Sequence, residues 1–320
     1  MQAVIAQNQE PVLVDIPTPS PAEDEILVKV HASALNRADL MQVAGNYPVP
    51  PGAPETLGME LAGDVVEVGA GVTAFSAGDR VMALVEGGGY AQFATARAAQ
   101  CMPIPEGMSY SQGAAIPEVF LTAYSNMVEI GGLLATDRVL IHAGASGVGL
   151  AAIQIAKIIG ATVIVTASAA KHDICLQQGA DAVIDYKSED FAAVVAERYG
   201  GVNLIIDFIG APYWQQNITA LEKWGRLVFV GLMGGAEAQV NLGQIMRKRL
   251  TITGSTLRDR TPERKANLVG RFWLWAAPHF ETGTLRPIIW REFPLDAVAA
   301  AHAAMRANQN AGKIILRIDH

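Results

Sequence analysis

Hydrophobic positions in the first third of the chain fall in short runs rather than in helical repeats. Residues 26–30 and 63–69 are rich in valine, and glycine and proline separate such runs from one another. Short apolar or alternating runs bounded by turn residues are typical of β-strands. The pattern therefore predicts a mostly-β region that extends to about residue 117.

From Asp137 onward, an apolar strand, a glycine or polar turn and a helix-period stretch follow one another repeatedly. The strands are expected at 138–142, 162–166, 182–185, 202–206, 226–230 and 250–254. The helices between them are clearest at 148–159, which is apolar on nearly all faces, and at 171–178, which ends before Gly179. This alternation is typical of βαβ units and a parallel sheet. Six strands suit one complete, doubly wound Rossmann sheet.

The final segment contains an apolar run at 287–290, a helical pattern at 296–306 and a strand pattern at 313–318. It has no place in a six-stranded sheet, so it is assigned to the first region. The sequence thus predicts an α/β domain at 118–257 that is inserted into a mostly-β domain formed by 1–117 and 258–320.

A glycine-rich turn joins the first strand of the expected sheet to its apolar helix. Its residues Gly144, Ser146, Gly147, Val148 and Gly149 match the G-x-G-x-x-G pattern imperfectly, because a serine holds the middle position. Such a turn lets a pyrophosphate approach the backbone and the helix N-terminus. Glycines at a strand-to-helix turn also occur for steric reasons alone. The strands and helix around the turn favour a dinucleotide site.

The residues after the second strand of this sheet select the dinucleotide. A carboxylate about 20 positions past the fingerprint would hold the ribose hydroxyl of NAD. This chain has no carboxylate there, but has Ser168 and Lys171, which match a 2′-phosphate. NADPH is therefore the expected cofactor, with a solvated role for Lys171 as the alternative.

Further cofactor contacts are expected where other parallel strands end, because ligands of such sheets bind at the carboxyl ends of the strands. Asp207 and His142 also lie at strand ends. We assign no chemistry to Asp207, which is a turn or cap residue or a base, and we interpret His142 as structural. The expected cofactor contacts are Phe208, Gly231, Leu232 and Met233.

The composition supports a compact enzyme and narrows the partners. Apolar residues make up 51% of the chain and charged residues 17%, which is ample for a buried core. The net charge of −7 argues against nucleic acid or an anionic membrane as a partner. The one dense basic cluster, 247–249, is expected to complement a helix C-terminus.

The cysteines and the apolar runs bear on the cellular compartment. Cys101 and Cys175 are far apart and lack a second thiol at metal-ligand or redox-motif spacing. The N-terminus does not resemble a signal peptide, and no run reaches the roughly 18 apolar residues of a membrane span. These features predict a cytoplasmic protein with reduced thiols.

Several short motifs resemble those of a known superfamily. They lie at residues 33–42, 58–63, 78–81, 105–107 and 231–235, besides the glycine turn. Together they resemble the medium-chain dehydrogenase/reductase superfamily, and within it the zinc-free quinone oxidoreductase branch, over essentially the whole chain. The resemblance implies a GroES-like catalytic domain interrupted by a Rossmann domain, bound NADPH and a homodimer.

The resemblance also implies roles for individual residues. Ser168, Lys171 and Tyr186 occupy positions that such reductases use around the 2′-phosphate of the cofactor. Lys313, in the motif that ends the likeness, is assigned to the cofactor site as well. Tyr47 and Asn36 occupy positions that line the nicotinamide and substrate pocket in the family.

The zinc enzymes of the superfamily need a cysteine near position 36, a histidine after Gly58 and a later cysteine or aspartate. This chain has Asn36 and Met59 at the first two positions, and it lacks the four closely spaced cysteines of the structural zinc lobe. No metal is therefore expected. Hydride transfer would then go directly to a quinone or another conjugated carbonyl compound, whose delocalised negative charge needs only a hydrogen-bond donor.

The Tyr47 hydroxyl and the Asn36 amide are the candidate donors, and the proton comes from Tyr47 or from solvent. Each residue also has a structural interpretation, because Tyr47 lies among prolines and asparagine is common at turns and helix caps. Two other functions stay open. One is an enoyl or enone reductase with the same cofactor, and the other is a non-catalytic protein that binds NADPH.

Overall fold

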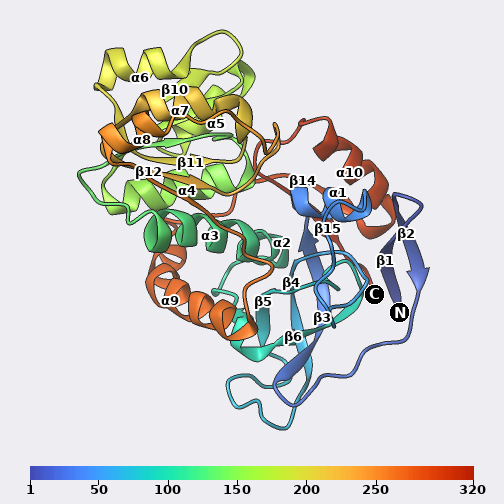
Figure 1. The fold of residues 1–320 in the computed structure, drawn as a ribbon. Coiled ribbons are helices and arrows are strands. Elements are labelled where there is room, and N and C mark those ends of the chain that lie inside the picture. Colours follow the sequence, from blue (N-terminus) through green and yellow to red (C-terminus); the bar gives the residue numbers. More distant parts are fainter. The chain divides into compact units, whose positions relative to one another are not determined.

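The computed structural model describes residues 1–320 and divides into two compact units. We call residues 122–257 the central unit, and residues 1–121 with 258–320 the flanking unit. Figure 1 labels the helices and strands of both units.

The central unit contains a six-stranded sheet in the order β10-β9-β8-β11-β12-β13. Neighbouring strands are parallel throughout. This is the strand order of a doubly wound Rossmann sheet, so the predicted sheet is confirmed. The strands are β8 (Arg138–Ile141), β9 (Thr162–Ala167), β10 (Ala182–Asp185), β11 (Val202–Asp207), β12 (Leu221–Phe229) and β13 (Thr251–Gly254).

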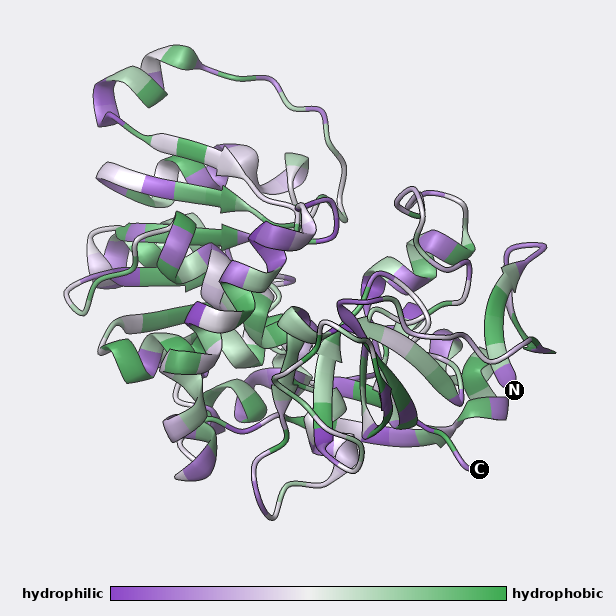
Figure 2. Cartoon of the chain, turned by 90° about the horizontal axis from the view of Figure 1, so that it is seen from below, coloured by the Kyte–Doolittle hydropathy of each residue, from purple (hydrophilic) through white to green (hydrophobic).

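The core of the central unit explains the near-continuous apolar runs of these strands. Leu140, Ile164, Ile205 and Leu227 are inaccessible to solvent or nearly so, and Figure 2 shows hydrophobic residues concentrated along the sheet. Helices lie on both faces of the sheet (Figure 1), so both faces of each central strand are covered. β12 begins five residues before the predicted strand at 226–230.

The helices of the central unit follow the predicted pattern. The predicted helix at 148–159 is confirmed as α4, which ends at Gly160 with φ +98°, a conformation that glycine adopts readily. The helix predicted at 171–178 is shorter and follows a single 3-10 turn. The helical segments are η2 (Ser125–Ile130, a π-helix), α4 (Gly147–Ile159), η3 (Ala169–Lys171), α5 (His172–Gln177), α6 (Phe191–Tyr199), η4 (Ala211–Tyr213), α7 (Trp214–Ala220) and α8 (Leu242–Lys248).

The basic cluster at 247–249 closes two helices. Arg247 and Lys248 form the last turn of α8, as the sequence predicts, and Arg249 follows with φ +54°. Lys248 Nζ also donates to the carbonyl oxygens of Ile218 (2.8 Å) and Thr219 (2.9 Å) in α7. The cluster is therefore a structural cap, because cations stabilise the carbonyl ends of helices.

The flanking unit is mostly β, as predicted. A seven-stranded sheet has the order β14-β15-β3-β4-β5-β7, with β6 also paired to β3, and β1 and β2 form a separate hairpin. The final segment does return to the first region, because Ile315 of β15 pairs with Ala34 of β3. The strands are β1 (Gln2–Gln7), β2 (Glu10–Asp15), β3 (Glu25–Ala34), β4 (Glu60–Val68), β5 (Arg80–Leu84), β6 (Phe93–Arg97), β7 (Cys101–Pro103), β14 (Ile289–Pro294) and β15 (Lys313–Arg317).

The longest helix of the flanking unit was not predicted from the sequence pattern. Helix α9 has Thr261 as its N-cap and Pro262 at its first position, and it buries Leu268, Phe272 and Phe280 at multiples of four residues. The helical segments of this unit are α1 (Arg37–Val43), η1 (Ala98–Gln100), α2 (Tyr110–Ala114), α3 (Pro117–Tyr124, which continues past the unit boundary), α9 (Pro262–Glu281), η5 (Leu295–Ala297) and α10 (Val298–Arg306).

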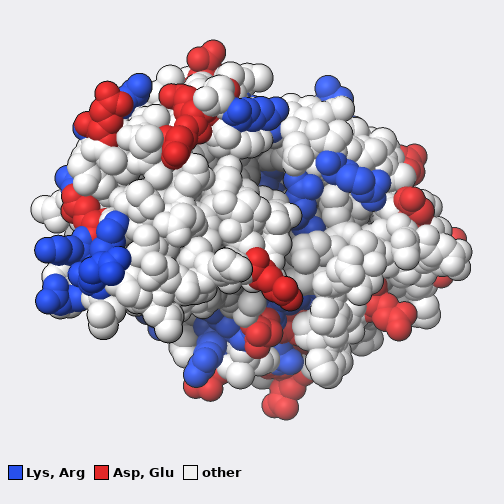
Figure 3. All heavy atoms as spheres, turned by 45° about the horizontal axis from the view of Figure 1, so that its top comes forward, with Lys and Arg blue, Asp and Glu red and all other residues white.

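The surface carries charges of both signs. Figure 3 shows acidic and basic side chains scattered over a largely uncharged face. None of the helices combines the length and the apolar character needed to cross a bilayer.

Candidate active site

The turn between β8 and α4 is shaped by two glycines. A Cβ atom on Gly144 would lie 2.6 Å from the Cβ of Val165 in the neighbouring strand, and one on Gly149 would lie 2.5 Å from the carbonyl oxygen of Ala143. Both separations are far shorter than carbon contacts allow. Glycine at these positions therefore lets the turn pack tightly against β9 and lets a ligand approach the backbone.

The serine that interrupts the glycine fingerprint caps helix α4. Its Oγ accepts a hydrogen bond from Gly149 N–H at 3.0 Å. The first N–H groups of a helix lack intrahelical acceptors. Because Ser146 accepts from the third, the N–H groups of Gly147 and Val148 are the first-turn donors that remain available, and both residues are only partly buried.

The residues expected around a 2′-phosphate follow two adjacent strands. Ser168 and Lys171 come after β9, and Tyr186 comes after β10, which pairs with β9 in parallel. The carboxyl ends of parallel neighbours share one edge of the sheet. The structure thus places all three residues at that edge, with Ser168 and Lys171 partly buried and Tyr186 exposed.

The third group of predicted contacts follows β11 and β12. Met233 N–H donates to the Phe208 carbonyl at 3.1 Å, and Gly231 N–H donates to the Asp207 carbonyl at 3.3 Å. Leu232 and Met233 are half-exposed, at 50% and 53%. Two large apolar side chains at the carboxyl end of the sheet are available for an apolar contact with a ligand.

His142 and Asp207 belong to a buried chain of polar side chains. Asn217 bridges them, since its Oδ1 lies 2.8 Å from His142 Nε2 and its Nδ2 donates to Asp207 Oδ2 at 2.8 Å. The Asp207 Oδ1 atom accepts the N–H of Ile209 at 2.6 Å. Burial lowers the pKa of His142. Both residues therefore hold the ends of β8 and β11 together, in agreement with the structural interpretation of His142.

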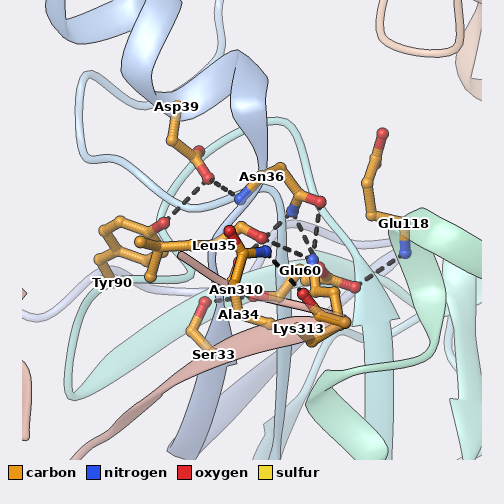
Figure 4. A network of polar contacts seen from close by, with 11 residues as sticks. Ser33, Ala34, Leu35, Asn36, Asp39, Glu60, Tyr90, Glu118, Asn310 and Lys313 are labelled. Atoms are coloured by element: carbon orange, nitrogen blue, oxygen red, sulfur yellow. Dashed lines mark hydrogen bonds and ion pairs between the residues drawn. The ribbon is translucent and has the colours of Figure 1, made fainter. Parts of the chain in front are cut away.

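Lys313, which the sequence assigned to the cofactor site, lies in the buried core of the flanking unit (Figure 4). Its Nζ atom donates to the Leu35 carbonyl oxygen (2.6 Å), to Asn36 Oδ1 (2.7 Å) and to Glu60 Oε1 (2.7 Å). An ammonium group has three N–H donors, and these contacts use all three. Lys313 thus has a structural role and no donor left for a cofactor.

Asn36 is occupied by the same cluster. Its Nδ2 atom donates to Glu60 Oε1 at 2.8 Å and to the Ala34 carbonyl at 3.3 Å, while its backbone N–H donates to Asp39 Oδ2 at 2.7 Å. Both amide hydrogens therefore have protein partners. Asn36 is the residue that precedes α1, and its engaged side chain favours a structural role over that of a free donor to substrate.

Three carboxyl groups surround the single ammonium of Lys313. Burial raises the pKa of Asp39 to about 6, and Tyr90 OH donates to Asp39 Oδ2 at 2.8 Å. Burial and the nearby Glu60 raise the pKa of Glu118 to about 8. The Glu118 backbone N–H donates to Glu60 Oε2 at 2.8 Å, and Figure 4 shows its side chain directed away from Glu60.

These carboxyl groups are not among the site residues that the sequence predicts. One signal was available, since Glu60 interrupts the apolar run from Leu57 to Ala62, and a carboxylate inside a buried strand needs a partner. Nothing local identified that partner as Lys313, which lies 253 positions further along the chain.

The same cluster bears on metal binding. Asn36 is fully engaged, Met59 is 2% exposed, and Glu60 is already paired with a cation. No group of three or more His, Cys, Asp or Glu side chains is arranged to hold a metal ion. The residues present do not fit a tetrahedral zinc site, which needs nitrogen, sulfur or carboxylate ligands.

Tyr47 lies in the same unit, beside Arg258, which is not among the site residues that the sequence predicts. The Cζ atom of Arg258 lies 5.0 Å from the centre of the Tyr47 ring, which is partly buried. Burial, followed by the charge of Glu118, raises the pKa of Tyr47, and Arg258 opposes this shift. The Tyr47 hydroxyl is therefore protonated at neutral pH and can donate a hydrogen bond.

The chain is similar in sequence and in structure to known oxidoreductases. Residues 147–272 match a zinc-binding dehydrogenase family and residues 22–106 match the alcohol dehydrogenase GroES-like domain. Human quinone oxidoreductase is 33% identical over 94% of this chain and 92% of its own length. The crystal structure of Escherichia coli quinone oxidoreductase complexed with NADPH covers 99% of both chains, with 29% identity and a TM-score of 0.90. The enoyl reductase CurK covers 99% of both chains, with 25% identity and a TM-score of 0.88.

Proposed function

Because this chain belongs to the medium-chain dehydrogenase/reductase superfamily, we propose that it reduces quinones and related conjugated carbonyl compounds with NADPH and without zinc. The chain is an oxidoreductase of this superfamily. The proposal that the acceptor is a quinone rests on the similarity to quinone oxidoreductases over nearly the whole chain. The proposal that the reaction needs no zinc rests on the Lys313 ammonium, which contacts Glu60 and Asn36.

The central unit supplies the cofactor contacts. The N–H groups of Gly147 and Val148 face the pyrophosphate, because they lie in the first turn of α4 behind a glycine turn. Ser168 and Lys171 bind the 2′-phosphate with a hydroxyl and a cation, and Tyr186 lies at the same edge of the sheet. Remaining contacts come from the residues after β11 and β12, which are Phe208, Gly231, Leu232 and Met233.

The flanking unit supplies the contact to the acceptor. NADPH, when bound, supplies the hydride. The Tyr47 hydroxyl donates a hydrogen bond to the acceptor carbonyl oxygen, whose negative charge grows during the reaction. A quinone or an enone spreads this charge over its conjugated system, so a hydrogen-bond donor can take the place of a zinc ion. Asn36, Glu60 and Lys313 hold the start of α1, from which the chain continues to Tyr47.

A screen of NADPH oxidation against quinones, enones and aldehydes tests this function. We expect turnover with quinones, no stoichiometric zinc by elemental analysis and unchanged activity after treatment with a chelator. One tightly bound zinc ion per chain would contradict the zinc-free reaction. NADPH binding without turnover of any acceptor would favour a non-catalytic protein.

An enone reductase is the second candidate, because CurK, an enoyl reductase, has the same fold over the full length of this chain. The product decides between the two functions. A quinone reductase yields a reduced ring, whereas an enone reductase yields a saturated carbon–carbon bond beside an intact carbonyl group. Product analysis by mass spectrometry and NMR distinguishes these outcomes.

We also propose that the protein is a cytoplasmic homodimer. Strand β13 lies at an edge of the central sheet, and an unpaired edge is a site where another copy can pair. Cys101 and Cys175 are both free and buried, in keeping with a reducing compartment.

A further inference from the structure

Arg258 is a buried arginine whose donors are only partly used. It is 8% exposed, and its Nη2 atom donates to the Glu86 carbonyl oxygen at 2.9 Å. Its Nε and Nη1 atoms are buried and have no hydrogen-bond partner. The guanidinium group also forms no ion pair with a carboxylate within the chain. The guanidinium therefore has two buried nitrogen donors without an acceptor.

This arrangement differs from that of arginines with structural roles. Arg226, for comparison, donates from Nε, Nη1 and Nη2 to three carbonyl oxygens and to Asp137. Buried donors are nearly always paired in folded proteins, and an unpaired one calls for a ligand or a functional explanation. Arginine cannot lose its charge by deprotonation. An anion is therefore the partner that its free N–H groups favour.

The position of Arg258 is fixed from several sides. Lys265 Nζ donates to the Arg258 carbonyl oxygen at 2.6 Å and forms an ion pair with Glu86 Oε1 at 2.6 Å. The guanidinium lies over the ring of Tyr47. A donor held in place before the reaction stabilises a developing charge at little cost in reorganisation.

We propose that the free N–H groups of Arg258, whose guanidinium lies over the ring of Tyr47, bind the oxygen atom of the acceptor that becomes negatively charged when hydride is added. This assignment rests on the proposed function. Arg258 is then a second group, besides Tyr47, that stabilises the negative charge on this oxygen in place of a metal ion.

The chemistry is balanced without a metal. Hydride adds to a carbon of the conjugated acceptor, and the electron pair of the broken π bond moves to the carbonyl oxygen. Arg258 and Tyr47 stabilise this oxygen by charge and by hydrogen bonds. A proton from solvent then completes the reduction, on oxygen in a quinone or on carbon in an enone.

The test compares Arg258→Met and Arg258→Lys in the full-length protein with NADPH. We expect Arg258→Met to lower kcat for quinone or enone about 10- to 100-fold, with an unchanged Kd for NADPH, because a charged donor to the transition state is lost. Arg258→Lys keeps the charge and should retain more of the activity. Arg291→Gln is the matched control, because Arg291 also lies over an aromatic ring, that of Trp290, but is exposed.

Binding of benzoate, an aromatic carboxylate, gives a second readout that does not depend on turnover. Calorimetry should detect benzoate binding to the native protein and to the Arg291→Gln variant. The affinity of the Arg258→Met variant for benzoate should be at least tenfold lower. Thermal unfolding shows whether each variant is folded, and Arg258→Lys serves if the methionine variant is not. If kcat and benzoate affinity are both unchanged in a folded variant, the inference is wrong while the proposed function stands. If the native protein reduces no quinone or enone, the proposed function is wrong. Benzoate binding then tests by itself whether Arg258 binds an anion.

Discussion

Lys313 Nζ lies 2.7 Å from Glu60 Oε1, and both side chains are buried. The two residues come from β15 and β4, which both flank β3, so the pair joins the C-terminal segment to the N-terminal region of the same sheet. Burial removes both charges from water, and the hydrogen bonds to Leu35, Asn36 and Glu118 satisfy the atoms that remain.

Replacing Lys313 by methionine should destabilise the protein strongly. The change leaves the buried carboxylate of Glu60 without its cation, which typically costs about 3–5 kcal/mol in the free energy of unfolding. The double variant Lys313→Met with Glu60→Leu should recover much of this loss, because neither buried charge remains. Urea unfolding of the three proteins measures the effect, and a loss below about 1 kcal/mol in the single variant would contradict it.

Glu118 should make the stability depend on pH. Burial, with Glu60 and Asp39, raises its pKa to about 8, and Lys313 and Lys265 oppose the shift. A carboxyl group with a raised pKa in the folded state stabilises most at low pH, and this contribution is lost as the pH rises from about 5 to 8. Glu118→Gln mimics the protonated form. Its stability relative to the native protein should rise by about 1–3 kcal/mol over that range.

The control for this pH series is Glu55→Gln, because Glu55 is exposed in the same unit. Its stability should follow that of the native protein at every pH. A constant difference between Glu118→Gln and the native protein from pH 5 to 9 would show that Glu118 does not titrate in this range.

The elements of the central unit were predictable because their signals are local. β8, β9 and β11 are apolar runs buried on both faces, and a glycine or cap residue marks the ends of α4. Helix α9 was missed although Thr261 and Pro262 mark its start. Its mean composition is polar, and its apolar positions cover only one face, so the pattern is weaker than in a helix buried all round.

The candidate site was predictable only where its chemistry follows a local motif. Ser146 could be recognised as part of a phosphate turn, but its capping of Gly149 depends on backbone geometry. Lys313 was predicted as a cofactor contact from the motif in which it lies, and a lysine in a sequence gives no local sign that it will be buried. Its partner and the free donors of Arg258 depend on contacts between residues more than 100 positions apart.

Lys171→Ala should discriminate between the two nicotinamide cofactors. An ion pair with the 2′-phosphate exists only for NADPH, so its loss should weaken NADPH binding by about 1–3 kcal/mol and leave NADH binding nearly unchanged. Fluorescence titration with each cofactor measures this. Lys187→Ala is the control, because Lys187 is exposed after the neighbouring strand β10. Equal losses for both cofactors would show that Lys171 has a structural role.

The proposed dimer can be tested at the edge of β13. Ser255 N–H donates to the Phe229 carbonyl at 2.9 Å, and alternate residues of a strand face opposite neighbours, so the N–H of Gly254 faces the free edge. A Cβ atom on Gly254 would meet nothing within 4 Å. Gly254→Pro therefore removes an edge donor without crowding, and Met246→Glu places a charge on α8, where Met246 is 75% exposed.

Light scattering at micromolar concentration should find a dimer for the native protein and a shift toward monomer for both variants. Gly254→Pro removes a hydrogen-bond donor that strand pairing needs, and Met246→Glu would bury a charge in the interface. Leu134→Glu is the matched control, since Leu134 is an exposed apolar residue of the same unit that is not part of β13 or α8. Its oligomeric state should equal that of the native protein. A native monomer would remove the dimer altogether, whereas a dimer that survives both substitutions would place the interface on another surface of the chain.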